Sequence, residues 1–202
     1  MTLLASETAI ETPRLVLRRI GWDDLDWFAE AHADAEVARY IGHGKPRTRQ
    51  ETEGWLAAIL ESYDRASLGQ LAVLRKDSGT LVGRCGLSDA AVALDCAPGA
   101  IRQGWFFTAH VPPGTAVQPL PELGYTFARE SWGQGYASEA AGAVWEYARA
   151  KLPFRAIMSV IHPENRASLA VASKYGVHYL DQLELSGRVF DRYHWPLEEN
   201  AA

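Results

Sequence analysis

The stretch ELGYTFARESWGQGYASEA, residues 122–140, decides how this chain folds. Its first part, ELGYTFA, is typical of a β-strand, and the residues from Tyr136 onward carry apolar side chains at helical spacing. Gly133 and Gly135 stand between the two. A tight turn seldom needs two glycines this close before a strong helix former. We therefore expect the backbone to approach a group there that a side chain would block.

A strand, a glycine turn and a helix N-terminus together make a site for an anion. The first N–H groups of a helix have no partner within it, and the helix dipole adds about half a positive charge. Small residues at Gly133, Gly135 and Ala137 leave room for a phosphate or pyrophosphate beside the main chain. The alternative is that the glycines only form a tight strand-to-helix turn.

Two well-known phosphate-binding patterns do not fit this turn. The Walker pattern needs Gly-Lys-Ser or Gly-Lys-Thr, and the sequence contains neither. The dinucleotide fingerprint needs a third glycine where Ser138 stands, and an acidic residue after the next strand, which ends at Ile161 without one. A nicotinamide-dependent oxidoreductase is therefore disfavoured.

The rest of the pattern predicts one mixed α/β domain over residues 1–202, with its core at about 12–197. Alternation, capping residues and turn signals predict strands over 14–20, 70–75, 80–87, 122–128, 154–161, 177–185 and 188–197, and helices over 22–34, 48–63, 136–152 and 165–175. Residues 97–121 are rich in glycine and proline, and they also hold the aromatic cluster Trp105–Phe107. We expect a long loop with a short extended piece there.

The composition argues against a nucleic-acid-binding protein and against a membrane protein. Lys and Arg number 20 against 25 Asp and Glu, a net charge of −5, which argues against binding through phosphate neutralisation. No apolar run is long enough to span a bilayer, and the N-terminus does not resemble a signal peptide. Cys85 and Cys96 fit neither a zinc site nor a disulfide framework, and the histidines lack metal-ligand spacing. We expect a cytoplasmic protein without a metal.

Four motifs in order resemble the GNAT N-acetyltransferase superfamily, and more narrowly its RimJ/RimL-like branch. They are TPRLVLR (12–18), VGRCGL (82–87), ELGYTFARESWGQGYASEA (122–140) and HPENRASLAVASKYG (162–176), and the resemblance covers about residues 12–197. It implies a central, mostly antiparallel split sheet flanked by helices. It also implies transfer of an acetyl group from acetyl-CoA to a primary amine, either a small molecule or a peptide N-terminus, by direct attack in a ternary complex.

The resemblance also implies which residues bind acetyl-CoA. The strand residues Tyr125, Thr126 and Phe127 would pair with the pantetheine arm. The glycine turn would hold the pyrophosphate through Trp132, Gly133, Gln134, Gly135, Tyr136 and Ala137. Asn165 and Lys174 of the last helix would complete the site. Trp132 stands where much of the superfamily has Arg or Gln. Asn165 is equally well explained as a helix N-cap.

For catalysis, the resemblance implies Glu122 as general base and Ser168 as proton donor to the thiolate, with a backbone N–H of the strand holding the oxyanion. The alternatives are a strand-entry glutamate that faces solvent and an ordinary first-turn serine. Ala172 occupies the position of a tyrosine proposed as general acid in many members. A non-catalytic acyl-CoA-binding regulatory module is therefore the second hypothesis.

Three further expectations concern the acceptor and assembly. Asp34 and Glu36, with Tyr40, are candidates to receive an amine, although a solvated helix end explains them as well. The aromatic cluster is expected to narrow the acceptor site or to make a homodimer contact. Cys85 is interpreted as a buried thiol and not as a carrier of the acetyl group, because no histidine or cation of VGRCGL pairs with it to lower its pKa.

Overall fold

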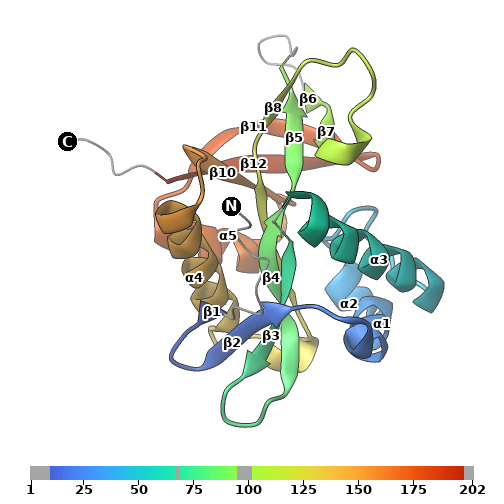
Figure 1. The fold of residues 1–202 in the computed structure, drawn as a ribbon, viewed down its shortest axis with the longest axis vertical. Helices are drawn as coiled ribbons and strands as arrows, with labels where there is room; N and C mark the ends of the chain where they lie inside the picture. The colour runs from blue at the N-terminus through green and yellow to red at the C-terminus, as the bar shows by residue number, and fades with distance from the viewer. Residues whose placement is uncertain (1–9, 67–68, 95–101, 198–202) are drawn as a thin grey trace.

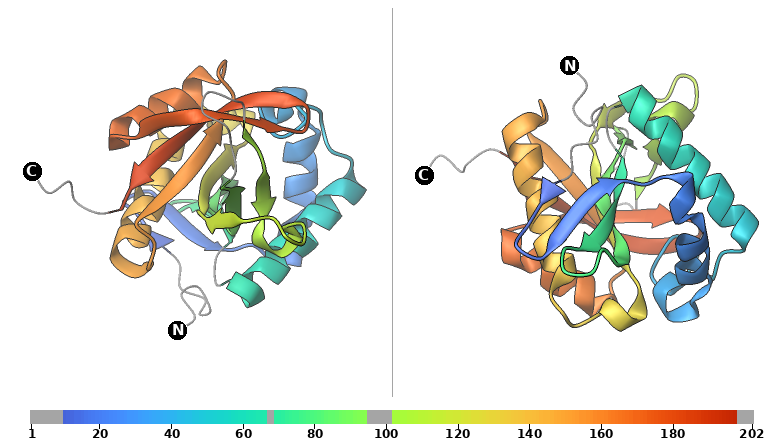
Figure 2. Two further views of the ribbon diagram at one scale, coloured as in Figure 1. Left: turned by 90° about the horizontal axis from the view of Figure 1, so that it is seen from above. Right: turned by 60° about the horizontal axis from the view of Figure 1, so that its bottom comes forward.

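The computed structural model describes residues 10–66, 69–94 and 102–197, and it contains a nine-stranded sheet with helices on both faces (Figures 1 and 2). The strand order is β1-β2-β3-β4-β9-β10-β12-β11-β6. Neighbouring strands are antiparallel except at β9–β10 and β11–β6. The strands are β1 (Ile10–Glu11), β2 (Leu15–Arg19), β3 (Gln70–Arg75), β4 (Leu81–Ser88), β6 (Arg102–Gln103), β9 (Glu122–Phe127), β10 (Ala156–Ile161), β11 (His178–Leu185) and β12 (Arg188–Pro196).

The helices form two groups on opposite sides of the sheet (Figure 1). The first group holds α1 (Leu25–Ala33), α2 (Ala35–Ala38) and α3 (Arg49–Ala66), and the second holds α4 (Tyr136–Lys151) and α5 (Arg166–Ala172). Helix α4 packs on β2, β4 and β9, and α1 packs on α3. The predicted mixed α/β fold around a mostly antiparallel sheet is confirmed.

The helix ends follow the capping residues in the sequence. Thr48 and Glu51 form the predicted capping box before α3, since the Thr48 N–H donates to Glu51 Oε2 (2.7 Å) and the Glu51 N–H donates to Thr48 Oγ1 (3.2 Å). Asn165 caps α5, and Gly176 ends the following turn with a φ of 65°. Short-range hydrogen bonding therefore fixes where these helices begin and stop.

The prediction of a loop over residues 97–121 was wrong for the part that the structure describes. Together with β5 (Ala90–Ala93), the segment forms a second, three-stranded antiparallel sheet with β7 (Trp105–Phe107) and β8 (Val117–Pro119). The glycines and prolines mark turns and an edge strand, and the aromatic side chains pack beside the small residues of β5. Residues 97–101 and Cys96 lie outside the described residues.

Candidate active site

The parallel pair β9 and β10 touches at one end and separates at the other. The pairing register contains Glu122 opposite Met158, and the Ser159 hydroxyl donates to the Leu123 carbonyl (2.7 Å). Farther along, toward Phe127 and Ile161, no further pair is formed between these two strands. The predicted split of the sheet therefore lies between β9 and β10, and it leaves the Tyr125–Phe127 edge of β9 unpaired on that side.

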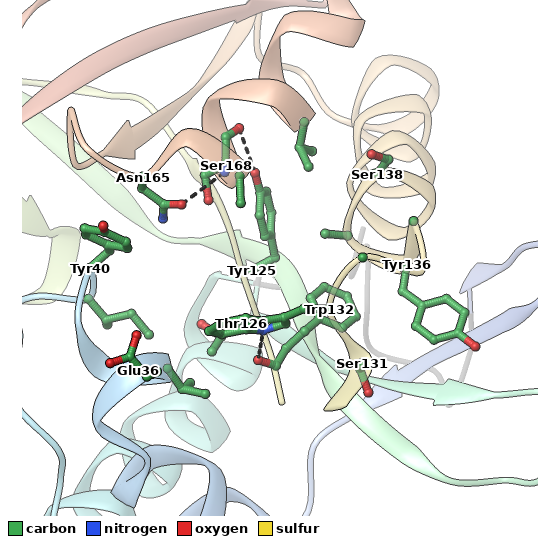
Figure 3. Close-up of a pocket in the computed structure, with 18 of the residues that line it drawn as sticks. Glu36, Tyr40, Tyr125, Thr126, Ser131, Trp132, Tyr136, Ser138, Asn165 and Ser168 are labelled. Atoms are coloured by element: carbon green, nitrogen blue, oxygen red, sulfur yellow. Dashed lines mark hydrogen bonds between the residues drawn. The ribbon is translucent and has the colours of Figure 1, made fainter. Parts of the chain in front are cut away.

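A cavity of about 420 Å³ opens at this split (Figure 3). Its wall comes from α2, from β9, from the glycine turn with the start of α4, and from α5. The lining residues are Glu36, Val37, Tyr40, Ile41, Tyr125, Thr126, Phe127, Ser131, Trp132, Gly133, Gly135, Tyr136, Ala137, Ser138, Asn165, Ala167, Ser168, Val171 and Lys174. A cavity of this size, with mostly apolar walls and a few polar groups, is typical of a site for a small molecule.

The glycine turn presents bare backbone to this cavity. Gly133 (φ 73°) and Gly135 (φ 82°) both adopt the left-handed conformation that favours glycine, and a Cβ on Gly133 would meet no atom within 4 Å. Helix α4 begins directly after Gly135 and has no side-chain cap. The N–H groups of its first turn thus lack a protein partner and face a cavity that has room for an anion.

The turn is held in place by hydrogen bonds on its outer side. Arg14 donates through Nη1 to the Gln134 carbonyl (3.0 Å) and pairs through Nε with Glu139 Oε2 (2.7 Å). The Trp132 indole N–H donates to the Phe127 carbonyl (2.8 Å), which ties the turn back to the end of β9 (Figure 3). These contacts leave the inner side of the turn open.

Comparison with known proteins identifies this arrangement. The family described as "Acetyltransferase (GNAT) domain" matches residues 14–178. This chain belongs to the GNAT acetyltransferase family. It is therefore an acetyl-CoA-dependent acetyltransferase, and acetyl-CoA is its cosubstrate.

Individual relatives of this GNAT chain are distant. The uncharacterized protein YkkB of Bacillus subtilis is 28% identical over 86% of this chain and 87% of its own length. The FsC-acetyl coenzyme A-N(2)-transacetylase of Aspergillus fumigatus is 26% identical over 97% of this chain and 73% of its own.

Solved structures share the fold of this GNAT protein. An acetyltransferase from Agrobacterium tumefaciens superposes with a TM-score of 0.69 at 25% identity, over 94% of this chain and 95% of that one. An acetyltransferase from Salmonella typhimurium, solved with acetyl-CoA, superposes with a TM-score of 0.62 at 17% identity over 93% and 96%.

Most of the predicted cofactor residues of this GNAT chain line the cavity, and Gln134 does not. The Gln134 side-chain amide donates to the Glu130 carbonyl (2.8 Å), on the outer side of the turn. Tyr136 turns its ring away from the cavity, under the guanidinium of Arg14, so it offers only backbone (Figure 3). Lys174 is on the wall, where its Nζ donates to Ser138 Oγ (2.8 Å). The predictions did not name Ser131 and Ser138, whereas Glu36 and Tyr40, predicted to receive an amine, also line this cavity.

Helix α5 is joined to β9 through its own backbone. The Ser168 N–H donates to Asn165 Oδ1 (3.1 Å), and the Tyr125 hydroxyl donates to the Ser168 carbonyl (3.3 Å) (Figure 3). Asn165 is thus a helix cap and a cavity residue at once. Ala172 is buried, and the nearby Tyr175 hydroxyl donates to the Ser138 carbonyl. Tyr175 therefore does not replace the tyrosine that the family pattern has at position 172.

Glu122 lies on the other face of β9 from Tyr125 and is not on the cavity wall. Because side chains alternate along a strand, Glu122 shares its face with Gly124 and Thr126. Burial raises the pKa of Glu122 to about 7, although the positive charge of Arg84 and a hydrogen bond from the Val160 N–H act in the opposite direction. A carboxyl group with this pKa can accept a proton near neutral pH.

Arg84 is a charged residue of this face to which the sequence analysis gave no role. It pairs with Thr126 in the β4–β9 register, and its Nη1 donates to Gln70 Oε1 (2.7 Å). Its guanidinium also lies 5.6 Å from the ring centre of Trp55, and burial lowers its pKa to about 10. The alternation of VGRCGL could have indicated it, because Arg84 is the charged residue within an otherwise apolar strand.

Other candidate groups take structural positions. Asp34 caps α2 through the N–H groups of Glu36 and Val37 and pairs with Arg129 (2.6 Å), so it is not available to an amine. Cys85 is fully buried, which raises the pKa of its thiol to about 12 and argues against thiolate chemistry. Within the described ranges, no group of three or more His, Cys, Asp or Glu side chains could hold a metal, and no helix is long and apolar enough to cross a membrane.

Proposed function

We propose that the chain is an N-acetyltransferase that holds the pyrophosphate of acetyl-CoA on the N–H groups of residues 133–137 and the pantetheine arm along Tyr125–Phe127. The Trp132 N–H already donates to the Arg129 carbonyl (3.1 Å), so Trp132 contributes only its side chain to the cavity wall. The observation that carries this proposal is the uncapped start of α4. Its two left-handed glycines open onto a cavity that continues into the split between β9 and β10. Asn165 and Lys174, which also line this cavity, supply an amide and a cation to the same ligand.

The proposed reaction is direct attack of a primary amine on the thioester. The amine nitrogen forms a bond to the acetyl carbon, and the carbon–sulfur bond breaks. Glu122 takes the proton that the amine loses, directly or through water, and its raised pKa suits this step at neutral pH. The thiolate of CoA takes up a proton, for which Ser168 is the proposed donor. A backbone N–H of Tyr125–Phe127 is the proposed partner of the oxyanion.

The sequence motifs place the chain, in our proposal, in the RimJ/RimL-like branch as a single domain. The fold likeness to RimL, a ribosomal L7/L12 alpha-N-protein acetyltransferase, supports this at 14% identity and a TM-score of 0.68. Small-molecule amines and peptide N-termini are both in keeping with the named relatives. We propose a cytoplasmic location, with the free thiol of Cys85 in keeping with reducing conditions. A homodimer contact through the partly exposed Phe107 stays a hypothesis.

One experiment separates the enzyme from the acyl-CoA-binding module. Thermal unfolding is measured with acetyl-CoA, CoA and NAD, and release of free CoA thiol is then followed with a panel of amines and short peptides. We expect acetyl-CoA to stabilise the protein and at least one amine to release thiol. Stabilisation without thiol release from any acceptor would favour the binding module, and no response to acetyl-CoA would contradict the cofactor site.

A further inference from the structure

A second cavity of about 130 Å³ adjoins the cofactor cavity, and its wall is basic. The two cavities share Val37 and Ile41. The charged and titratable residues on the second wall are His32, His43, Lys45 and Arg47. No carboxylate of the described residues lines it. A volume of 130 Å³ is about that of four waters in the liquid, enough for a carboxylate with a short substituent.

Arg47 is on this wall, whereas Arg84 lines neither cavity but lies close enough for the two charges to act on each other. Each has its pKa lowered by burial, and the charge of Arg47 lowers the pKa of Arg84 further, so the two guanidinium groups repel each other. In the described part of the chain neither forms an ion pair with a carboxylate, and only the longer-range charges of Glu51 and Glu122 oppose them. The Nε atom of Arg84 is buried and has no hydrogen-bond partner.

Arg84 Nη1 donates to Gln70 Oε1, but leaving its buried Nε without a partner is costly. The flat edge of a guanidinium matches the two oxygens of a carboxylate, and Nε is one of the donors of that edge. His32 does not add a charge, because burial with the charges of Arg84 and Arg47 lowers its pKa to about 3. The second cavity thus presents Arg47 to an anion, and the nearby buried charge of Arg84 adds to the attraction.

We propose that the acceptor of this acetyltransferase is an amine whose own molecule carries a carboxylate, as a free amino acid does. Arg47 holds the carboxylate, and the nearby charge of Arg84 adds to the attraction. This inference rests on the proposed function, because it assigns the acceptor of the same reaction. The amine of the acceptor then lies toward Glu122 and Thr126, which share the sheet face of Arg84. Thr126 also lines the cofactor cavity, and its buried hydroxyl has no partner, so the two ligands meet there.

The experiment compares matched acceptors on the full chain with saturating acetyl-CoA. Twenty free α-amino acids, their amides and 2-aminoethyl phosphate are tested by release of CoA thiol, with rates corrected for the fraction of unprotonated amine. We expect the kcat/KM of the best amino acid to exceed that of its amide by about tenfold or more, because the amide lacks the charged carboxylate that would accept hydrogen bonds from Arg47. Arg47→Gln should bring this ratio toward one, and Arg47→Lys should retain part of it.

Arg149→Gln is the matched control, because it removes the same charge from α4, away from both cavity walls. Equal rates for acids and amides, a preference for the phosphate compound, or an unchanged ratio in Arg47→Gln would each overturn the proposal. Thermal stabilisation by acetyl-CoA is measured in parallel. Stabilisation and thiol release without a carboxylate preference would refute only this inference, whereas failure of acetyl-CoA to bind would refute the proposed function.

Discussion

The proposed cofactor end and the proposed acceptor end of the cleft are built from different kinds of chemical groups. The cofactor end is made mostly of one continuous stretch, residues 122–138, and it offers backbone N–H groups, glycines and neutral side chains. The acceptor end brings together Arg47 from a loop, Arg84 from β4 and Glu122 from β9, all of them charged groups in a partly buried setting.

The difference follows from what each end has to recognise. A pyrophosphate is the same in every reaction cycle, and main-chain groups at a helix start bind it with little dependence on side-chain identity. An acceptor has to be distinguished from similar amines, and discrimination requires side chains with particular charges. We therefore expect substitutions at the acceptor end to alter turnover and selectivity, and substitutions at the glycine turn to alter cofactor affinity.

The largest expected effect is that of Glu122→Gln. Gln keeps the shape of the side chain and removes its ability to take a proton, so we expect kcat to fall by about a thousandfold, within the usual range for loss of a general base. Acetyl-CoA affinity should change little. The control is Glu146→Gln, which removes one acid from α4, where Glu146 pairs with Arg149.

The pH profile of kcat sharpens this prediction. A base works in its ionised form, and the pKa of Glu122 is raised to about 7. Activity should accordingly be low below pH 6 and rise as the pH passes through about 7, because kcat reports groups in the bound complex. The rise should be absent in Glu122→Gln. If the variant retained the wild-type profile and rate, Glu122 would not be the base.

Gly135→Glu should weaken acetyl-CoA binding by about a hundredfold, through the strained left-handed backbone and the added negative charge at a phosphate site. Gly135 has a φ of 82°, and a Cβ there would lie 3.3 Å from Arg14 Nη2. Calorimetric titration with acetyl-CoA measures the loss. The matched control is Gly79→Glu in the β3–β4 turn, where φ is also positive (67°) and the Cβ would contact nothing within 4 Å. If both variants lost the same amount of acetyl-CoA affinity, the cause would be general backbone strain and not the phosphate site.

Most of the residues predicted to bind the cofactor line one cavity, because the determinants of that part of the fold are local. The strand, the two glycines and the helix after them are neighbours along the chain, and each signals its own conformation. Gln134 was misjudged as a cavity residue because the direction of its side chain depends on the Glu130 carbonyl and on Arg14, neither of which the motif encodes.

No role was predicted from the sequence for Arg47 and Arg84, because their proximity depends on tertiary structure. Arg84 and Arg47 are 37 positions apart by their numbering, and only the pairing of β4 with β9 and the path of the 41–47 segment bring them together. The second sheet was missed for a related reason. Its strands are short and separated by glycine and proline, and their partners lie in a different part of the chain.

Ser168→Ala should lower kcat by about tenfold if the hydroxyl protonates the departing thiolate, which is less than the usual effect of losing a proton-transfer group because water can replace the hydroxyl. The variant tests the hydroxyl alone, because Ser168 bonds to Asn165 and Tyr125 through its own N–H and carbonyl. Ser173→Ala, whose hydroxyl donates to the Ala170 carbonyl, serves as the control. Equal kcat in the two variants would make Ser168 an ordinary first-turn serine.

The smallest expected effect is that of Thr48→Ala, which breaks the capping box directly after Arg47. The Glu51 N–H loses its partner, and the thermal unfolding midpoint should fall by about 2–4 °C, as for loss of one helix cap in a chain of this size. Thr48→Ser keeps the hydroxyl and should retain the wild-type midpoint. Because the cap fixes the backbone that carries Arg47, Thr48→Ala should raise the KM for the acceptor more than the KM for acetyl-CoA. A larger change in the KM for acetyl-CoA would show that the two ends of the cleft are not as separate as their construction indicates.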